Sequence, residues 1–378
     1  MRMLLGALAL AASIVHTATR AGQVETLYTS PPHQTIAAFA QDGNLVAWFA
    51  PGSAGACNEV WLWQLGGAQQ RLPAQGPTNR NVTCGWQVPP GAPVGLAVAE
   101  NGGSPALLWT LHESAAQSLR FDYVLGATVA DPTERRFQQV AHGTHGPGLW
   151  LTGVAGSGAT LVYAVTQVAY KNQVDCLTSP KTPGACDLVV VGGGGGVYRV
   201  VGRKLPQPIK GVPASVEVAA SGNEIAYVPA GGSSTTDGHP FASANVSIEV
   251  RTTDMGTFVA SVSTDGTPEA IALSSSTLAL LARVGDKVEL SWYALPDGSL
   301  LGNVTVPAKT APELSAGESS IVFRVGRSIR VVDVKTQKVR TVATATSTPI
   351  GLSIAGSRIA WAENVAGRGR IRAITLAQ

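Results

Sequence analysis

The chain has few charged residues and few signals of helical structure. Charged residues make up only 13% of its 378 residues, and aromatic residues only 6%. After the first twenty residues, no long window repeats its apolar residues with helical periodicity, which argues against a helical protein. Glycine is frequent, with 43 residues, and Val, Ala, Ser and Thr are abundant. This composition suits sheets that are buried on both faces and predicts an all-β fold.

Linear catalytic and metal-binding motifs are missing as well. The sequence has no Cys-x-x-Cys, no His-Glu-x-x-His and no Gly-x-Ser-x-Gly, the patterns of many zinc sites and hydrolases. Residues 192–196 are all glycine, but another predicted strand follows them, whereas a phosphate loop needs a helix there. We therefore expect no cofactor and no metal. Because a propeller can assemble a site from several repeats, these absences alone do not exclude an enzyme.

What the sequence does contain is a short recurring pattern: a turn-forming lead-in, two aliphatic or small residues, and then a large one. It occurs seven times, at intervals of 38 to 64 residues. A period near about 40–50 residues is typical of four-stranded propeller blades. The copies are Val46-Ala47-Trp48, Leu107-Leu108-Trp109, Leu161-Val162-Tyr163, Ile225-Ala226-Tyr227, Leu278-Ala279-Leu280, Ile321-Val322-Phe323 and Ile359-Ala360-Trp361.

These repeats predict a seven-bladed β-propeller, with six blades as the alternative, in one domain over residues 22–378. The last repeat is one strand short, and residues 23–29 can supply that strand from the N-terminus. Such a closure ties both ends of the chain into one sheet and removes open sheet edges.

A family resemblance rests on the turns that lead into the repeated strand. The stretches are Gln41-Asp42-Gly43-Asn44-Leu45-Val46-Ala47-Trp48, Ser221-Gly222-Asn223-Glu224-Ile225-Ala226-Tyr227 and Gly356-Ser357-Arg358-Ile359-Ala360-Trp361. They resemble the WD40-like propeller repeats of bacterial exported proteins, the group that includes the TolB propeller. In that family a Pro-Asp-Gly turn usually precedes an Ile-Ala-Phe strand. None of the three stretches keeps the proline, and no Trp-Asp dipeptide ends a strand. The resemblance covers nearly the whole of residues 22–378 as architecture, implies binding to another macromolecule, and carries over no catalytic residue.

The N-terminus predicts export. Arg2 precedes an apolar stretch over residues 3–15, and Thr19-Arg20-Ala21 follows as a cleavage-site pattern, which is the order of a secretory signal peptide. A stretch this short does not span a bilayer comfortably, since ~20 residues are needed. We expect a signal peptide at residues 1–21, with an uncleaved anchor as the alternative. The mature chain should lack a transmembrane segment and lie in the periplasm or outside the cell.

The four cysteines fit an oxidising compartment. Four cysteines allow three pairings, and the sequence alone does not choose among them. Cys176 and Cys186 are ten residues apart around one long predicted loop. This favours a disulfide between them and leaves Cys57 to pair with Cys84.

The long connections predict a binding face. Residues 51–59, 171–185 and 229–245 connect second to third strands, and residues 74–93 and 141–148 connect blades. In a four-stranded propeller these connections open on one side, and long loops on a rigid scaffold commonly bind ligands. The candidate binding residues there are Trp86, His142, His145, Lys171, Asp175, Asp237 and His239. The alternative is a metal site in which His142 and His145 act together with Asp131 or Asp175.

The C-terminal part of the chain is basic. From residue 324 onward, ten Lys and Arg face two acidic residues, about +8 against about −5 for the rest. Such an asymmetry can steer an anionic partner, although a solvated rim is the plainer interpretation. Export and the lack of interleaved aromatic residues argue against nucleic acid. The candidate anion patch is Arg324, Arg327, Arg330, Arg368, Arg370 and Arg372.

The sequence thus favours an exported, monomeric binding module that engages a protein or a cell-envelope component through a disulfide-stapled loop face. One alternative is an exported propeller enzyme, a hydrolase or lyase acting on an envelope glycan or peptide. The other is a purely structural surface protein. An enzyme should gather carboxylates, His or Arg around the mouth of the central channel, whereas a binder should expose an apolar and aromatic patch.

Overall fold

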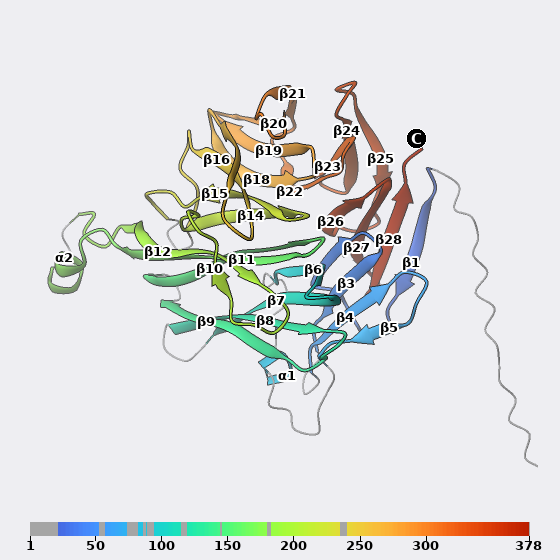
Figure 1. Ribbon diagram of the computed structural model, residues 1–378, viewed down its shortest axis with the longest axis horizontal. Coiled ribbons are helices and arrows are strands. Elements are labelled where there is room, and N and C mark those ends of the chain that lie inside the picture. Colours follow the sequence, from blue (N-terminus) through green and yellow to red (C-terminus); the bar gives the residue numbers. More distant parts are fainter. Residues whose placement is uncertain are drawn as a thin grey trace, which may run out of the picture.

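The computed structural model describes residues 22–52, 57–73, 82–85, 88, 94–114, 119–143, 146–179, 183–234 and 240–377. Within these residues, nearly all regular structure is β-strand (Figure 1). The two helices there are short: α1 (Val82–Gly85) and α2 (Gln173–Thr178). The predicted all-β fold is confirmed.

Five separate four-stranded antiparallel sheets form the blades of a β-propeller. In four of them the strands pair in the order of the sequence, so that each sheet is a meander. The first contains β2 (Ala38–Asp42), β3 (Leu45–Ala50), β4 (Glu59–Gln64) and β5 (Gln69–Arg71). The next three contain β14 (Ser215–Ser221), β15 (Glu224–Pro229), β16 (Ser247–Thr252) and β17 (Phe258–Ser263); β18 (Thr267–Leu273), β19 (Thr277–Val284), β20 (Lys287–Ala294) and β21 (Leu300–Val306); and β22 (Thr310–Ala316), β23 (Ser320–Val325), β24 (Ser328–Asp333) and β25 (Val339–Thr344).

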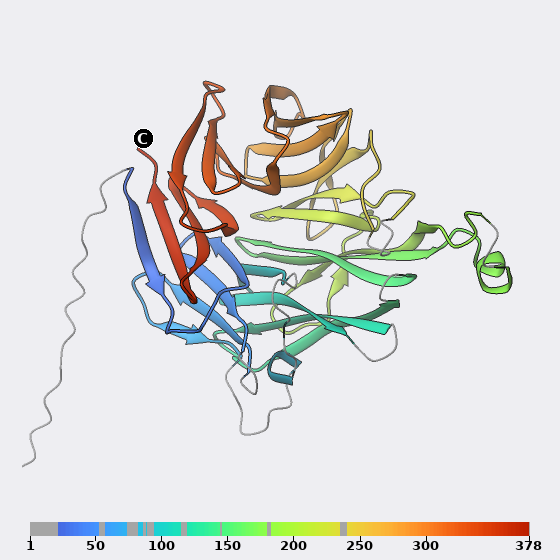
Figure 2. The same cartoon turned by 180° about the vertical axis from the view of Figure 1, so that it is seen from behind.

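The fifth blade joins the two ends of the chain. It contains β26 (Ile350–Ala355), β27 (Arg358–Val365), β28 (Arg368–Thr375) and, outermost, β1 (Val24–Thr29). β1 pairs antiparallel with β28, from Val24 opposite Ile374 to Thr29 opposite Arg370. Figure 2 shows these two terminal strands side by side. The predicted closing strand is therefore present.

The remaining eight strands form one continuous sheet, in sequence order, between the blades β2–β5 and β14–β17. It comprises β6 (Leu96–Asn101), β7 (Ser104–Ser114), β8 (Leu119–Thr128), β9 (Arg135–Gly143), β10 (Gly148–Ser157), β11 (Thr160–Tyr170), β12 (Leu188–Val200) and β13 (Gln207–Pro208). Its members β6 and β10 contact each other, and they also contact β2 and β14 of the neighbouring blades. The sheet thus fills the rest of the ring in Figures 1 and 2.

The predicted blade count, seven with six as the alternative, is wrong: the structure has five blades beside the eight-stranded sheet. The physical reason lies at the join of β9 and β10, where Gly148 pairs with His142. Gly148 has a φ of +140°, and a Cβ on it would lie 2.4 Å from the His142 Cα. Glycine therefore lets the two strands approach and merges their meanders. The repeat pattern locates strands, but it does not report whether neighbouring meanders join.

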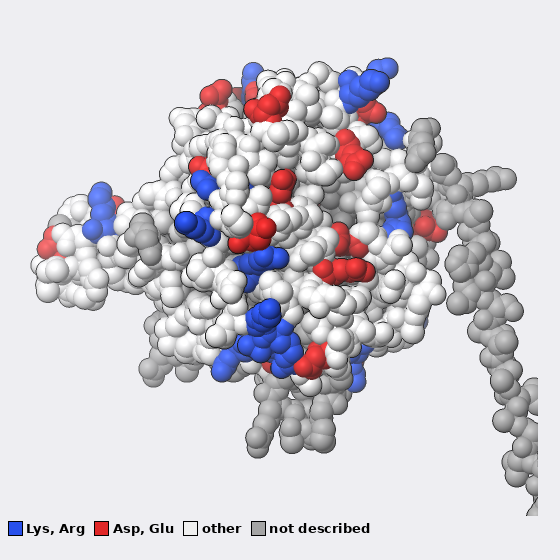
Figure 3. All heavy atoms as spheres, viewed as in Figure 1, with Lys and Arg blue, Asp and Glu red and all other residues white. Residues whose placement is uncertain are grey.

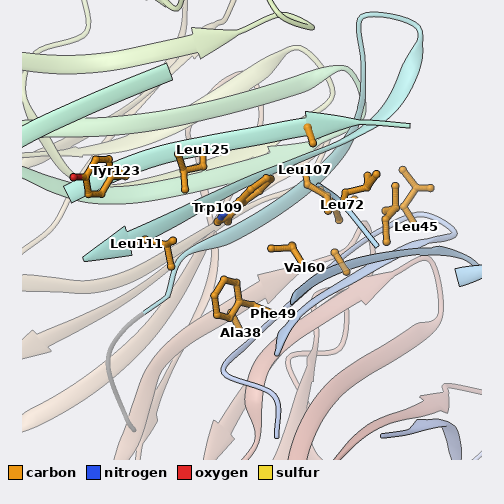
Figure 4. Close-up of a cluster of buried hydrophobic side chains, with 14 residues drawn as sticks. Ala38, Leu45, Phe49, Val60, Leu72, Leu107, Trp109, Leu111, Tyr123 and Leu125 are labelled. Atoms are coloured by element: carbon orange, nitrogen blue, oxygen red, sulfur yellow. The ribbon is translucent and has the colours of Figure 1, made fainter. Parts of the chain in front are cut away.

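The large residue of the repeat is buried between neighbouring sheets. Trp48, Trp109, Tyr163, Phe323 and Trp361 are each at most 1% exposed. Figure 4 shows one such cluster, in which Ala38, Phe49 and Val60 from the first blade meet Trp109, Leu111, Tyr123 and Leu125. Burial of one large apolar side chain contributes roughly 1.5–3 kcal/mol. These interfaces make the ring a rigid frame for its connections.

Candidate functional site

The connections on one side of the ring carry both helices and both disulfides. We define the loop face as the connections β3–β4, β7–β8, β11–β12 and β15–β16, together with β5–β6 and β9–β10. α1 belongs to the β5–β6 connection and α2 to the β11–β12 connection. Cys57 pairs with Cys84, and Cys176 pairs with Cys186. Both pairings are those that the sequence favours.

The segment around Cys84 is fixed to the ring. The Glu134 carboxylate accepts hydrogen bonds from the Val82 and Thr83 amides at 2.6 and 3.0 Å, and also from the Thr83 hydroxyl. That hydroxyl accepts a bond from Trp109 Nε1 at 2.9 Å, and the Thr83 carbonyl accepts one from Asn58 at 2.8 Å. Asn58 directly precedes β4 of the first blade, Glu134 directly precedes β9, and Trp109 lies on β7 of the eight-stranded sheet. The segment that carries Cys84 is therefore held by residues of both sheets and their connections.

The β11–β12 hairpin is built differently, since it extends away from the ring and carries α2 at its end (Figure 1). Asn172 caps α2 by accepting the Asp175 amide at 3.1 Å, and the Lys171 amide donates to the Asp187 carbonyl at 2.7 Å. Val174 and Leu177 are each 69% exposed. The hairpin therefore presents an apolar pair on a disulfide-held helix, with the predicted residues Lys171, which is exposed, and Asp175, which is half-buried, nearby in the sequence.

A buried polar cluster lies beneath the same face, at the join of β9 and β10. Asp122 of β8 is 1% exposed, and its Oδ1 lies 2.7 Å from His112 Nδ1. Its Oδ2 lies 3.3 Å from His142 Nε2 and accepts the Leu151 amide at 3.2 Å. Burial by itself would raise the pKa of Asp122, but the hydrogen bonds and charges of the two histidines hold that pKa well below its ordinary value.

Both ring nitrogens of His142 face hydrogen-bond acceptors. Nδ1 lies 2.7 Å from the Gly143 carbonyl oxygen, and Nε2 faces the Asp122 carboxylate. A neutral imidazole has one donor and one acceptor, so only the doubly protonated ring satisfies both partners. The ring also stacks on Trp150, with centroids 3.7 Å apart, an arrangement that favours a cation. His142 is 3% exposed and is therefore an internal residue of the loop face, not a solvent-facing ligand.

The remaining predicted binding and metal-site residues do not form a site among the described residues. Trp86, His145, Asp237 and His239 lie outside the described residues. Asp131, considered as a partner for a metal, forms an ion pair with Arg203 at 2.7 Å. Within the part of the chain that the structure describes, no group of three or more His, Cys, Asp or Glu could hold a metal ion.

The predicted anion patch is divided and partly neutralised. Arg324 forms an ion pair with Glu313 at 2.5 Å, and Arg372 forms one with Glu363 at 3.2 Å. Arg327 donates to the Thr346 carbonyl at 3.0 Å. Arg330 lies on β24 and has a buried Nε, whereas Arg368 and Arg370 lie on β28, in the neighbouring blade. Figure 3 shows Lys and Arg interspersed with Asp and Glu, with no continuous field of one sign on the face that it displays.

The residues that sequence analysis missed are Asp122, His112 and Glu134. Asp122 and His112 are direct cross-strand partners in the β7–β8 hairpin. The signal that could have found them is the hairpin register, which places both on one face of the sheet, two positions from the pair Arg120 and His142.

The opposite side of the ring, where first and second strands turn, contains a cavity of about 370 Å³. Asp42 and Glu100 line it together with Gln64 and Gly158. Burial raises the pKa of Asp42, and the charge of Glu100 adds to this effect, while hydrogen bonds from Gly158 and Ser157 oppose it.

Among the described residues, no helix is long and apolar enough to cross a bilayer.

Comparison with known proteins finds only distant structural similarity to β-propellers. No family model matches the sequence, and no curated protein matches it. Solved structures similar to the chain include the β-propeller domain of the Trilobed protease from Pyrococcus furiosus, at 8% identity over 90% of this chain and 95% of that one, with a TM-score of 0.48. The Dos1 propeller is similar at 10% identity over 94% and 97%, with a TM-score of 0.45. A prolyl endopeptidase structure is similar at 11% identity over 87% of this chain and 45% of that one, with a TM-score of 0.46.

Likenesses this distant carry no argument about activity. The sheets and their closure make the chain a β-propeller, with two disulfides on its loop face. The narrower resemblance to WD40-like, TolB-type repeats stays a prediction.

Proposed function

We propose that this chain is an exported binding module whose β11–β12 hairpin contacts a protein of the cell envelope. The observation that carries the proposal is the exposed pair Val174 and Leu177, each 69% exposed on a helix held by a disulfide. Residues three apart on a helix lie on the same side, so the two side chains can enter one apolar pocket of a partner.

The expected energetics favour such a contact. Burial of two aliphatic side chains at an interface yields roughly 1.5–3 kcal/mol each. The Cys176–Cys186 disulfide and the Asn172 cap restrict the segment before binding, which lowers the ordering cost that a free loop would add. Lys171 and Asp175 lie at the edge of the apolar pair, where charges act on orientation and rate more than on affinity.

Two features support export. The disulfides are stable in an oxidising compartment, the periplasm or the exterior. The sequence of residues 1–21 has the order of a signal peptide. The predicted monomer remains part of this proposal.

The test is capture of partners from an envelope extract by residues 22–378, compared between a V174S/L177S variant and a control. Leu205→Ser is the matched control, because Leu205 is 77% exposed but lies outside the loop face, between β12 and β13. We expect the control to retain a partner that the double variant loses. Equal capture by both variants, or none by the wild type, would remove the hairpin as the binding element and favour a structural surface protein.

A second candidate is an exported enzyme acting on an envelope glycan. It is favoured by the cavity of about 370 Å³ that Asp42 and Glu100 both line. Burial, together with the charge of Glu100, raises the pKa of Asp42 there. Glycoside hydrolysis uses a pair of carboxyl groups, one of which has a raised pKa. Wild type and an E100Q variant should be compared on purified envelope glycans. Product from the wild type alone would support this candidate, and no product from either would reject it.

A further inference from the structure

The join of β9 and β10 rests on a small number of contacts. Gly148 opposite His142 is the one residue pair between the two strands. Asp122 adds the bond from the Leu151 amide, and the stack of His142 on Trp150 spans the same junction. We call His112, Asp122, His142 and Trp150 the junction cluster.

The junction cluster contacts the base of the β11–β12 hairpin. Trp150 Nε1 donates to the Gly146 carbonyl at 3.2 Å. Tyr170, the last residue of β11, places its hydroxyl over Gly146, 3.6 Å from where a Cβ on that glycine would lie. Lys171 and α2 follow directly. Gly146 thus lies between Trp150 of the junction cluster and Tyr170 at the base of the hairpin.

The titratable and charged groups that face His142 come from every neighbouring strand. β7 contributes His112, and β8 contributes Asp122 and Arg120. Tyr170, the last residue of β11, lies over Gly146. β10 contributes the uncharged Trp150 and the Leu151 amide. Arg120 is the direct cross-strand partner of His142, and its Nε is buried without a hydrogen-bond partner in the described part of the chain. Asp122 is thus the one carboxylate among these groups.

We propose that protonation of the junction histidines latches β9 to β10 and fixes the base of the β11–β12 hairpin, so that binding through the hairpin weakens as pH rises. The binding part of this proposal rests on the proposed function. When the His142 ring loses a proton, one of its nitrogens presents a lone pair to an acceptor, either the Gly143 carbonyl or Asp122. The ring then turns, and its stack on Trp150 loosens.

The direction of the effect follows from the charges. The latch is complete while Asp122 is ionised and His142 is protonated, and it is lost when a rise in pH removes a proton from the His142 ring. Asp122 stays ionised during this rise because its pKa is held well below the ordinary value. The latch therefore opens on the alkaline side.

The test is hydrogen exchange measured by mass spectrometry on residues 22–378 between pH 5 and pH 8, expressed as protection relative to the intrinsic rate at each pH. We expect protection of peptides covering residues 141–151 and 163–173 to fall at least about threefold toward pH 8. His142→Gln should remove this pH dependence. His33→Gln is the control, because His33 is exposed between β1 and β2, and it should preserve the dependence.

Protection of β1 and β28 reports whether each variant folds. Should His142→Gln fail that check, ¹⁵N spectra of the histidine rings in the wild type provide the second test. Protons on both nitrogens of His142 at pH 6 are expected, and a neutral ring at pH 6 would overturn the proposal. Flat protection across the pH range in the wild type would overturn it as well. Because neither measurement needs a partner, a pH-dependent junction without any captured partner would refute the proposed function and leave the latch standing.

Discussion

Replacement of Gly148 by alanine tests the close approach that merges the two meanders. A Cβ there would lie 2.4 Å from the His142 Cα and 2.6 Å from the Ala141 carbonyl oxygen. The φ of +140° is also closed to L-residues, and holding a residue in such a region costs about 1–3 kcal/mol. Steric overlap in a packed site adds about 1–3 kcal/mol. We expect G148A to lower the free energy of unfolding by the sum, about 2–6 kcal/mol.

The control is Gly285→Ala in the β19–β20 turn. Gly285 also has a positive φ, +62°, but nothing lies within 4 Å of where its Cβ would be. Alanine there costs only the left-handed conformation, about 1–2 kcal/mol. Urea unfolding of both variants, followed by far-ultraviolet circular dichroism, measures the difference. If G148A lost no more stability than G285A, the close approach of β10 to β9 would not be what joins the sheet.

Three further predictions concern polar groups inside the ring. Asn101 is 1% exposed; its side-chain amide donates hydrogen bonds to the Ala159 and Val200 carbonyls and accepts one from the Gly202 amide. N101A should lower the free energy of unfolding in urea by about 3–5 kcal/mol. A loss below ~1 kcal/mol would contradict the importance of these hydrogen bonds. Burial raises the pKa of Glu217 to about 7, so folding opposes its ionisation. E217Q should therefore raise the free energy of unfolding by about 1–3 kcal/mol at pH 8 and by little near pH 4. An equal gain at pH 8 and pH 4 would contradict the raised pKa of Glu217. Asp122 has a lowered pKa, so its contribution, present at neutral pH, is lost only in strong acid. D122N should consequently be less stable than wild type near pH 5, and the difference should shrink as pH falls toward 2, as thermal unfolding from pH 2 to 6 would show; a difference that does not change with pH would contradict this.

The sequence predicted the strands better than it predicted how they join. The repeat located buried residues such as Trp48 and Trp361 because an apolar run flanked by turn residues is a local signal. The closing strand was also predictable, since the last repeat was one strand short. The continuity of the eight-stranded sheet was not, because it depends on one glycine meeting a residue of another strand.

The same distinction explains the candidate site. The cysteine pairs followed from spacing, whereas His142 was assigned to a loop that begins at residue 141. In the structure β9 runs to Gly143, which turns His142 into a buried residue of a strand. Asp122 escaped notice because an acidic residue in the middle of a strand reads as solvent-exposed, and only the register with His112 shows its burial. Glu134 reaches α1 through the fold, over about fifty positions of sequence.

The measurement that tests the central claim most directly is site-specific photo-crosslinking in intact cells of the source organism. A photoreactive residue replaces Leu177 of α2 in one strain and Leu205 in another, two leucines of similar exposure at 69% and 77%. A discrete crosslinked product formed from position 177 and absent from position 205 is the predicted result. Products of the same size from both positions, or none from position 177, would contradict the assignment of the hairpin as the binding element.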